Sequence, residues 1–319
     1  MRAYHKSTAD ARACVTQIDR PTPEPGQILL KIAACGLNFA DLLMLKGQYQ
    51  DTPALPFTLG MEVAGTVEAL GDGVTDPAIG TRVAVFGGQG GLAEYGCFDA
   101  TRAVPLPDMM SMTDAAAFLI AYGTSHLALD HRARMQPGET LLVLGAAGGV
   151  GLTAVEVGKL MGATVIACAR GADKLEAARR AGADHLIDAA TDDIRAVVKS
   201  LGGADVVYDP VGGDQWQAAF RACNPEARLL PIGFASGEVP QIPANHLLVK
   251  NLSVLGVYWG GYMTFRPQAV TDSLRVLMGW YAEGRIKPHV SHILPLDQVE
   301  DGLELLRSRA STGKVVITM

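Results

Sequence analysis

The stretch that decides the fold is residues 139–162, which read ETLLVLGAAGGVGLTAVEVGKLMG. It opens with the apolar run Thr140–Leu144, which is short enough to be a buried parallel strand. Its second half carries apolar residues at roughly helical spacing until Gly162 ends the pattern. A further apolar run follows at Thr164–Ala169. The stretch therefore predicts a strand, a glycine-rich turn, a helix and a second strand, which together form a βαβ unit.

The glycine-rich turn, GAAGGVG at residues 145–151, has the pattern of a dinucleotide-binding loop. Gly148 lets the backbone approach a pyrophosphate, and Gly151 lets the helix lie close to the strand. Ala146 replaces the first glycine of the usual G-x-G-x-x-G pattern, with Gly145 one residue earlier. Unpaired N–H groups and the positive dipole end at the helix N-terminus favour phosphate there. We expect this turn to hold a dinucleotide at Ala147, Gly148, Gly149 and Val150.

Composition and charge exclude several classes of protein. The 319 residues carry a net charge of −6, which provides no basic surface for nucleic acid or an anionic membrane. No apolar run reaches membrane-spanning length, and the N-terminus does not read as a signal peptide. The five cysteines form no C-x-x-C pair, so neither a disulfide framework nor a zinc knuckle is indicated. We expect a cytoplasmic protein with reduced thiols.

The alternation of strand and helix continues beyond the βαβ unit. Further strands are predicted at residues 185–187, 204–209, 228–234 and 253–258. Residues 1–110 read instead as short strands and turns, and the C-terminal part as helices at 266–283 and 295–308 before a strand at 314–318. We therefore expect an α/β protein. A doubly wound parallel sheet should span residues 122–261, and a discontinuous β-rich domain residues 1–121 and 262–319, with the cofactor in the cleft between them.

Several short strings occur along nearly the whole chain in the order of one known family. They are GLNFAD at 36–41, GMEVAG at 60–65, AYGTSH at 121–126, the glycine-rich turn, DPVGG at 209–213 and KN at 250–251. Together they resemble the zinc-free quinone oxidoreductase (zeta-crystallin-like) branch of the medium-chain dehydrogenase/reductase superfamily. The resemblance implies a GroES-like catalytic domain with a Rossmann domain, NADPH as cofactor, and a homodimer.

The resemblance also bears on metal binding. In zinc-dependent relatives a cysteine stands at the position of Asn38 and a histidine at the position of Met61. Neither an amide nor a thioether is a suitable ligand for catalytic zinc. The four cysteines of the relatives' structural zinc lobe are also missing after Phe86. We therefore expect no metal, and we interpret Glu62 as a hydrogen-bonded structural carboxylate.

The end of the second strand indicates the type of cofactor. An NAD enzyme carries an acid there for the ribose 2′-hydroxyl, whereas this chain has Arg170, with Lys174 one helical turn later. Two cations suit a 2′-phosphate and predict NADPH, although both could be ordinary solvated charges. Relatives place a tyrosine near the end of the third strand, where this chain reads Asp188-Ala189-Ala190. Lys314 matches a basic residue that relatives turn toward the cofactor phosphates; alternatively it is a surface lysine opening an edge strand.

The remaining site residues follow from the resemblance and from simple hydrogen-bond chemistry. The nicotinamide end should be lined by Thr124, Val211, Phe234, Val257 and Tyr258, together with Asn38. Trp259 lies next to these and fits either packing or the site. For catalysis, Asn38 and Tyr49 are the candidates to donate hydrogen bonds to a substrate oxyanion. Asp41 is expected to cap the helix that starts there.

Three functions remain open at this point. The resemblance favours an NADPH-dependent, zinc-independent reductase of quinones or related conjugated carbonyls. A 2-enoyl-thioester reductase is the alternative enzyme, because that branch shares the arrangement Asn38…Asp41…Gly47-x-Tyr49. A non-catalytic nucleotide- or RNA-binding relative is the third, and the acidic balance opposes RNA as the main partner.

Overall fold

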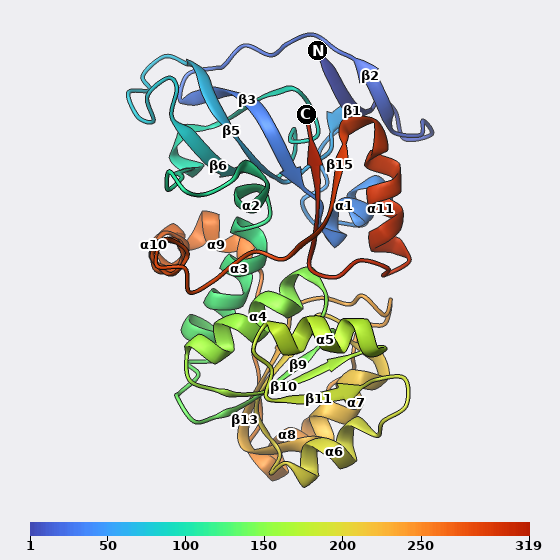
Figure 1. The fold of residues 1–319 in the computed structure, drawn as a ribbon. Helices are drawn as coiled ribbons and strands as arrows, with labels where there is room; N and C mark the ends of the chain where they lie inside the picture. Colours follow the sequence, from blue (N-terminus) through green and yellow to red (C-terminus); the bar gives the residue numbers. More distant parts are fainter. The chain divides into compact units, whose positions relative to one another are not determined.

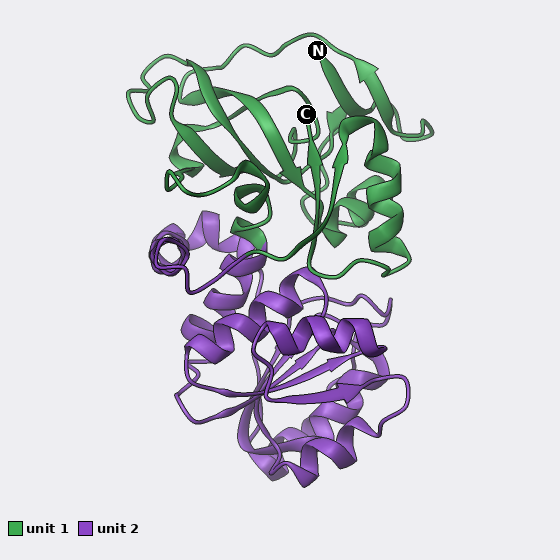
Figure 2. Ribbon diagram, in the orientation of Figure 1, with its two compact units in different colours: residues 1–120, 288–319 green, residues 121–287 purple.

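The computed structural model describes residues 1–319 and divides the chain into two compact units, which Figure 1 shows as a ribbon and Figure 2 shows by colour. Unit 1 comprises Met1–Ile120 and Pro288–Met319, and unit 2 comprises Ala121–Lys287. The chain therefore passes between the units at residues 120/121 and 287/288, where the sequence predicted 121/122 and 261/262.

Helices α9 (Trp259–Phe265) and α10 (Pro267–Ala282) account for the difference at the second boundary. Nδ1 of His126 lies 2.9 Å from the Ser273 hydroxyl of α10. The His126 ring also meets Trp280 edge-on, with centroids 5.4 Å apart. The residues predicted to begin the β-rich domain therefore pack inside unit 2. The helix predicted at 266–283 corresponds to α10, and α9 is a further helix that precedes it; the two are separated at Arg266 because a residue before proline avoids the helical conformation.

Unit 2 is built on a six-stranded parallel sheet in the order β11-β10-β9-β12-β13-β14. The strands are β9 (Thr140–Leu144), β10 (Thr164–Ala169), β11 (His185–Asp188), β12 (Ala204–Asp209), β13 (Cys223–Pro231) and β14 (Ser253–Val254). The helices are α3 (Leu119–His126), the π-helix η2 (Leu127–Arg132), α4 (Gly149–Leu160), α5 (Ala172–Arg180), α6 (Ile194–Ser200), α7 (Gly213–Ala222), α8 (Ala244–Lys250), α9 and α10. This strand order, with its reversal between β9 and β12, confirms the predicted doubly wound Rossmann sheet.

Helices cover both faces of this sheet, as Figure 1 shows for α4 and α5 on one side and α6, α7 and α8 on the other. The strands are consequently buried on both faces, and Leu142 and Leu144 of β9 are fully buried. Trp216 and Phe220 of α7 pack into the same core with nearly parallel rings. The near-continuous apolar runs of the sequence thus reflect a sheet with helices packed on both of its faces.

Unit 1 is the β-rich unit and contains two sheets. A three-stranded antiparallel sheet has the order β2-β1-β4, and a seven-stranded sheet has the order β15-β16-β3-β5-β6-β8, with β7 also paired to β3. The strands are β1 (Arg2–Lys6), β2 (Cys14–Gln17), β3 (Gln27–Gly36), β4 (Phe57–Thr58), β5 (Glu62–Leu70), β6 (Arg82–Phe86), β7 (Tyr95–Asp99), β8 (Ala103–Pro105), β15 (Val290–Pro295) and β16 (Lys314–Thr318). The helical segments are α1 (Phe39–Leu45), η1 (Ala100–Arg102), α2 (Met112–Ala116), η3 (Leu296–Gln298) and α11 (Val299–Arg307).

The pairing of β16 with β3 matters most for the site. These strands run antiparallel, with Val316 opposite Gly36 and Ile317 opposite Cys35. The C-terminal strand therefore lies beside the segment that leads into α1. No helix of either unit is both long and apolar enough to cross a membrane.

Candidate functional site

The glycine-rich turn of unit 2 has the geometry that a pyrophosphate requires. A Cβ at Gly151 would lie 2.2 Å from the carbonyl oxygen of Gly145, so only glycine fits between helix and strand. At Gly148, the N-cap of α4, an added Cβ would meet only the Gly145 oxygen, at an ordinary 3.4 Å. The chain itself thus leaves space at Gly148 that a phosphate can occupy. Ala146 is buried and donates its N–H to the Cys168 carbonyl, so its methyl group does not obstruct the turn.

Some of the residues predicted around the nicotinamide lie near this turn. A Cβ at Gly145 would come within 2.8 Å of the Val211 side chain, which places Val211 directly against it. The backbone N–H of Val211 donates to Asp209 at 2.6 Å, which fixes the turn after β12. Phe234 is 41% exposed, and its ring lies next to Gly212, where an added Cβ would be 3.6 Å from it.

Thr124, Val257 and Tyr258 have less direct support. Thr124 is buried on α3, whereas Val257 and Tyr258 are partly exposed before α9. Trp259 is buried, and a Cβ at Gly123 would come within 2.7 Å of its indole nitrogen. This close packing of Trp259 on α3 favours the packing interpretation over the site interpretation.

The end of β10 holds the two predicted cations and also an acid. Arg170 is exposed after β10, and Lys174 lies in the first turn of α5. Oδ1 of Asp188, from the end of β11, accepts N–H bonds from Gly171 at 3.1 Å and from Ala190 at 3.0 Å. These N–H groups hold the pKa of Asp188 below its usual value. The sequence placed Asp188 at the end of the third strand, and the pairing of β10 with β11 brings it beside the end of β10.

In unit 1, three polar side chains form a buried cluster: Asn38, Glu62 and Lys314. The Lys314 ammonium forms an ion pair with Glu62 Oε1 and donates to Asn38 Oδ1 at 2.8 Å. Asn38 Nδ2 donates to Glu62 Oε1 at 3.1 Å and to the Gly36 carbonyl at 3.2 Å. Glu62 Oε2 accepts the Ile120 N–H at 3.0 Å. Glu62 and Lys314 are only 1% and 5% exposed, so their ion pair forms away from bulk water, whereas Asn38 is partly exposed.

This network fixes the orientation of the Asn38 amide. Its nitrogen faces two acceptors and its oxygen faces an ammonium, so a flipped amide would place like groups together. Both amide hydrogens are therefore used within unit 1, and the carbonyl oxygen accepts from the Lys314 ammonium. This geometry does not support the predicted donation from Asn38 to a substrate oxyanion.

Lys314 is buried, and its role toward the cofactor phosphates stays a prediction. The alternative of a surface lysine on an edge strand is wrong, because β16 runs between β15 and β3 and the side chain is buried. Its Nζ contacts Glu62 and Asn38 of its own unit. The resemblance had implied that this side chain turns toward the cofactor phosphates. The physical reason is that a buried carboxylate requires a cation, and Lys314 is the one that meets Glu62. Glu62 is accordingly the hydrogen-bonded carboxylate that its position suggested.

Asp41 supports the same cluster through the backbone of Asn38. It stands at the N3 position of α1, not at the N-cap, and its Oδ2 accepts the backbone N–H of Asn38 at 2.7 Å. Burial raises the pKa of Asp41 to about 7, and the Asn38 N–H and the Lys314 charge only partly oppose this rise. The nearby negative charge of Glu62 raises it further. Asp41 therefore takes up a proton near neutral pH.

We expect this carboxyl group to make stability fall as the pH rises. Between pH 4 and 7 the folded chain holds a proton on Asp41 that the unfolded chain releases, so the free energy of unfolding decreases as pH rises. Asp41→Asn keeps an acceptor for the Asn38 N–H and cannot ionise. The difference in free energy of unfolding between Asp41→Asn and wild type should grow in favour of the variant by about 2–3 kcal/mol from pH 5 to pH 8. Urea unfolding measures this difference. Asp10→Asn, at an exposed acid of unit 1, is the control, and parallel wild-type and Asp41→Asn curves would contradict the expectation.

Tyr49 follows α1 in a short turn. Its carbonyl accepts the Thr52 hydroxyl at 2.6 Å and the Thr52 N–H at 3.1 Å, which holds the turn. The side chain is half-buried. Burial, together with the charges of Asp51 and Asp41, raises the pKa of Tyr49 to about 12. The phenol therefore remains a protonated hydrogen-bond donor throughout the neutral range.

The side chains offer no arrangement suited to a metal. No group of three or more His, Cys, Asp or Glu side chains is placed to hold one. Met61, at the position where zinc-dependent relatives have histidine, is buried with 3% exposure.

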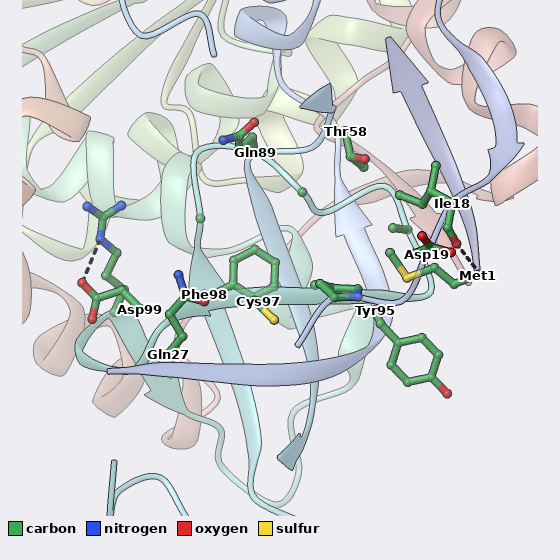
Figure 3. Close-up of a pocket in the computed structure, with 16 residues that line it drawn as sticks. Met1, Ile18, Asp19, Gln27, Thr58, Gln89, Tyr95, Cys97, Phe98 and Asp99 are labelled. Atoms are coloured by element: carbon green, nitrogen blue, oxygen red, sulfur yellow. Dashed lines mark hydrogen bonds and ion pairs between the residues drawn. The ribbon is translucent and has the colours of Figure 1, made fainter. Parts of the chain in front are cut away.

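A pocket of about 490 Å³ in unit 1 lies apart from the predicted residues (Figure 3). Its labelled lining comes from the N-terminal segment, β3, β4, β7 and the 87–91 loop, and includes Thr58, Gln89, Tyr95 and Phe98. None of the predicted catalytic or cofactor residues lines it.

Comparisons with known proteins agree with this architecture. Residues 24–108 match the family described as alcohol dehydrogenase GroES-like domain, and residues 149–274 match the zinc-binding dehydrogenase family. The chain is 40% identical over 297 residues to the quinone oxidoreductase-like protein 2 homolog of Nematostella vectensis, covering 91% of this chain and 81% of the relative. It is 33% identical over 315 residues to the human synaptic vesicle membrane protein VAT-1 homolog, covering 93% and 80%.

A solved structure extends the similarity to the whole chain. The quinone oxidoreductase of Thermus thermophilus, described also in complex with NADPH, is 32% identical with a TM-score of 0.88, and all of both chains is covered. The two domain families, the relatives and the paired Rossmann and GroES-like units point to the same group of enzymes. This chain belongs to the zinc-free quinone oxidoreductase branch of the medium-chain dehydrogenase/reductase superfamily.

Proposed function

We propose that this protein is an NADPH-dependent, zinc-independent reductase of quinones or related conjugated carbonyls. The observation that carries the proposal is the glycine-rich turn with space at Gly148, combined with Arg170 and Lys174 after β10. Such a turn suits the pyrophosphate, and the cations suit a 2′-phosphate. The NADPH complex of the similar Thermus thermophilus enzyme supports the same cofactor. A homodimer in the cytoplasm belongs to this proposal, and light scattering after gel filtration tests the dimer.

Zinc independence is supported by the charge of the Asn38 cluster. The Lys314 ammonium already neutralises Glu62, and a divalent cation beside it would be repelled. Asn38 and Met61 also offer no thiolate or imidazole. Turnover is therefore expected to be unchanged after chelation and dialysis, whereas stoichiometric zinc that is required for turnover would overturn this part of the proposal.

The bound cofactor would supply hydride from the nicotinamide, and the chain's own residues have modest tasks. Tyr49 would donate a hydrogen bond to the oxyanion that forms on the substrate. Because its pKa is about 12, the phenol would not release its proton to a phenolate-like oxyanion with a pKa near 10. Water would then protonate the product.

The second candidate, a 2-enoyl-thioester reductase, is favoured by the arrangement of Asn38, Asp41 and Tyr49. Hydride addition to an enoyl thioester gives an enolate, which is far more basic than a phenolate. Tyr49 could then deliver its proton, as a general acid. A screen of NADPH oxidation across quinones, enones and enoyl-CoA esters distinguishes the two reactions. No turnover of any of them, with nucleotide still bound, would leave the non-catalytic alternative.

Tyr49→Phe provides the sharper test of these two roles. If Tyr49 only donates a hydrogen bond, quinone kcat/KM should fall by about tenfold or less, since a neutral hydrogen bond is worth about 0.5–1.5 kcal/mol. A general acid contributes about 10²–10⁴-fold. Steady-state kinetics with a good quinone substrate measure the loss, and Tyr95→Phe on β7 is the control. A loss beyond a hundredfold, or enoyl-CoA esters as far better substrates that Tyr49→Phe cripples, would favour the second candidate.

A further inference from the structure

The loop at the end of β10 brings charges of opposite sign to one place. In the parallel pair of β10 and β11, Ala169 lies opposite Asp188. Arg170 and Gly171 follow Ala169 directly, and the Asp188 carboxylate accepts the Gly171 N–H at 3.1 Å. Gly171 is the N-cap of α5, with a φ of 82° and no side chain to separate the carboxylate from the loop. The acid thus lies one hydrogen bond from the segment that carries the cations.

This segment is where a Rossmann fold distinguishes the two nicotinamide dinucleotides. A carboxylate here accepts a hydrogen bond from the ribose 2′-hydroxyl, whereas an arginine accommodates a 2′-phosphate. Asp188 is partly exposed, and the Ala190 and Gly171 N–H groups keep it ionised at neutral pH. Arg170 follows β10, and Lys174 lies with Asp173 in the first turn of α5. The Asp192 carboxylate accepts the Asp188 N–H at 2.8 Å. A 2′-phosphate carries nearly two negative charges and would be repelled by the carboxylates.

We propose that Asp188 is a specificity-determining residue that limits the preference of this protein for NADPH over NADH. The proposal rests on the proposed function, because it assumes that the loop after β10 receives the adenosine ribose. Arg170 and Lys174 attract the 2′-phosphate, while Asp188 opposes it and remains available to a 2′-hydroxyl. The preference for NADPH over NADH is therefore smaller than it would be with Arg170 and Lys174 but without Asp188. NADH remains a usable cofactor.

The carboxylate also has a structural task, since it holds Gly171 and Ala190 together. Asparagine can perform that task, because its side-chain oxygen accepts the same two N–H groups. Asp188→Asn therefore removes the charge and preserves the loop. Asp188→Glu retains the negative charge, so it should keep the wild-type cofactor preference if the charge of Asp188 is what limits that preference. Asp184→Asn is the matched control, because Asp184 precedes the same strand at its other end, beside Lys159 at 2.8 Å.

The test measures the Kd of NADPH and NADH by isothermal titration calorimetry for wild type and the three variants. At a few ångströms in water-like surroundings, the repulsion corresponds to about three- to tenfold in affinity. We expect Asp188→Asn to bind NADPH about three- to tenfold more tightly, with NADH unchanged or weaker. Asp188→Glu and Asp184→Asn should keep the wild-type ratio of the two Kd values within about twofold.

Three results would overturn the proposal. The first is an unchanged Kd ratio in a folded Asp188→Asn protein that still binds NADPH, which leaves the proposed function intact. The second is an equal change in Asp184→Asn, which would assign the effect to net charge. The third is a wild-type protein that binds neither nucleotide, which would remove the proposed function together with this inference. If Asp188→Asn did not fold, a wild-type preference for NADPH above about a thousandfold would contradict the inference by itself.

Discussion

Replacing Arg170 and Lys174 together by alanine is expected to weaken NADPH binding by about a hundredfold or more. Each charge-assisted hydrogen bond to the 2′-phosphate is worth about 1.5–3 kcal/mol, and two of them correspond to about 10²–10⁴ in Kd. NADH lacks this phosphate, so its Kd should change by less than about threefold. Both side chains lie on a solvent-facing loop and helix start, so the fold should not depend on them.

The same helix offers a matched control. Arg179 and Arg180 lie in the last turn of α5, and replacing both by alanine removes the same net charge at the opposite end. Arg179→Ala/Arg180→Ala should therefore leave both Kd values near wild type. Titration at two salt concentrations adds a second readout, because the loss in the Arg170/Lys174 variant should shrink as salt screens the contact. Equal wild-type affinities for NADPH and NADH, or an unchanged NADPH Kd in the double variant, would contradict the assignment.

Features that depend on local sequence were predictable here. The turn at residues 145–151 indicates its strand and helix because Gly151 is required by a contact only six residues away, with Gly145. The alternation of apolar runs then predicts the order of elements in unit 2. The break between α9 and α10 was also predictable in principle, because Pro267 directly follows Arg266 and favours the first position of a helix.

The polar contacts that join distant segments were not predictable. Lys314 meets Asn38 across 276 positions, and only the pairing of β16 with β3 brings them together. Asp188 meets Gly171 for a similar reason, since neither residue carries a signal of the register between β10 and β11. A strand pattern predicts burial of one residue at a time. It does not predict which buried cation will neutralise which buried carboxylate.

Lys314→Met is expected to lower the free energy of unfolding by about 3–5 kcal/mol. Removing one partner of a buried pair leaves the other charge without compensation, and Glu62 is 1% exposed. Asn38 would also lose the ammonium that fixes its amide oxygen. The double variant Lys314→Met/Glu62→Gln carries no net charge change, and the amide oxygen of the introduced glutamine can still accept the Ile120 N–H. The amide nitrogen of this glutamine then faces the Asn38 amide nitrogen, so the double variant should recover only part of the loss. A double-mutant cycle from urea unfolding measures this coupling.

The double variant also decides what Lys314 does for the cofactor. If the ammonium serves Glu62 and Asn38 alone, the stable double variant should bind NADPH within about fivefold of wild type, since at most a neutral hydrogen bond is affected. If the ammonium contacts the cofactor phosphates, the double variant loses a charge-assisted hydrogen bond to NADPH. The salt dependence of NADPH binding should then also decrease. If the stable double variant had an NADPH Kd about fiftyfold or more above wild type, the result would show that Lys314 contacts the cofactor phosphates. An additive cycle with no coupling would show that the ion pair does not stabilise unit 1. Because stability and nucleotide affinity are measured separately, each of these two roles can fail without the other.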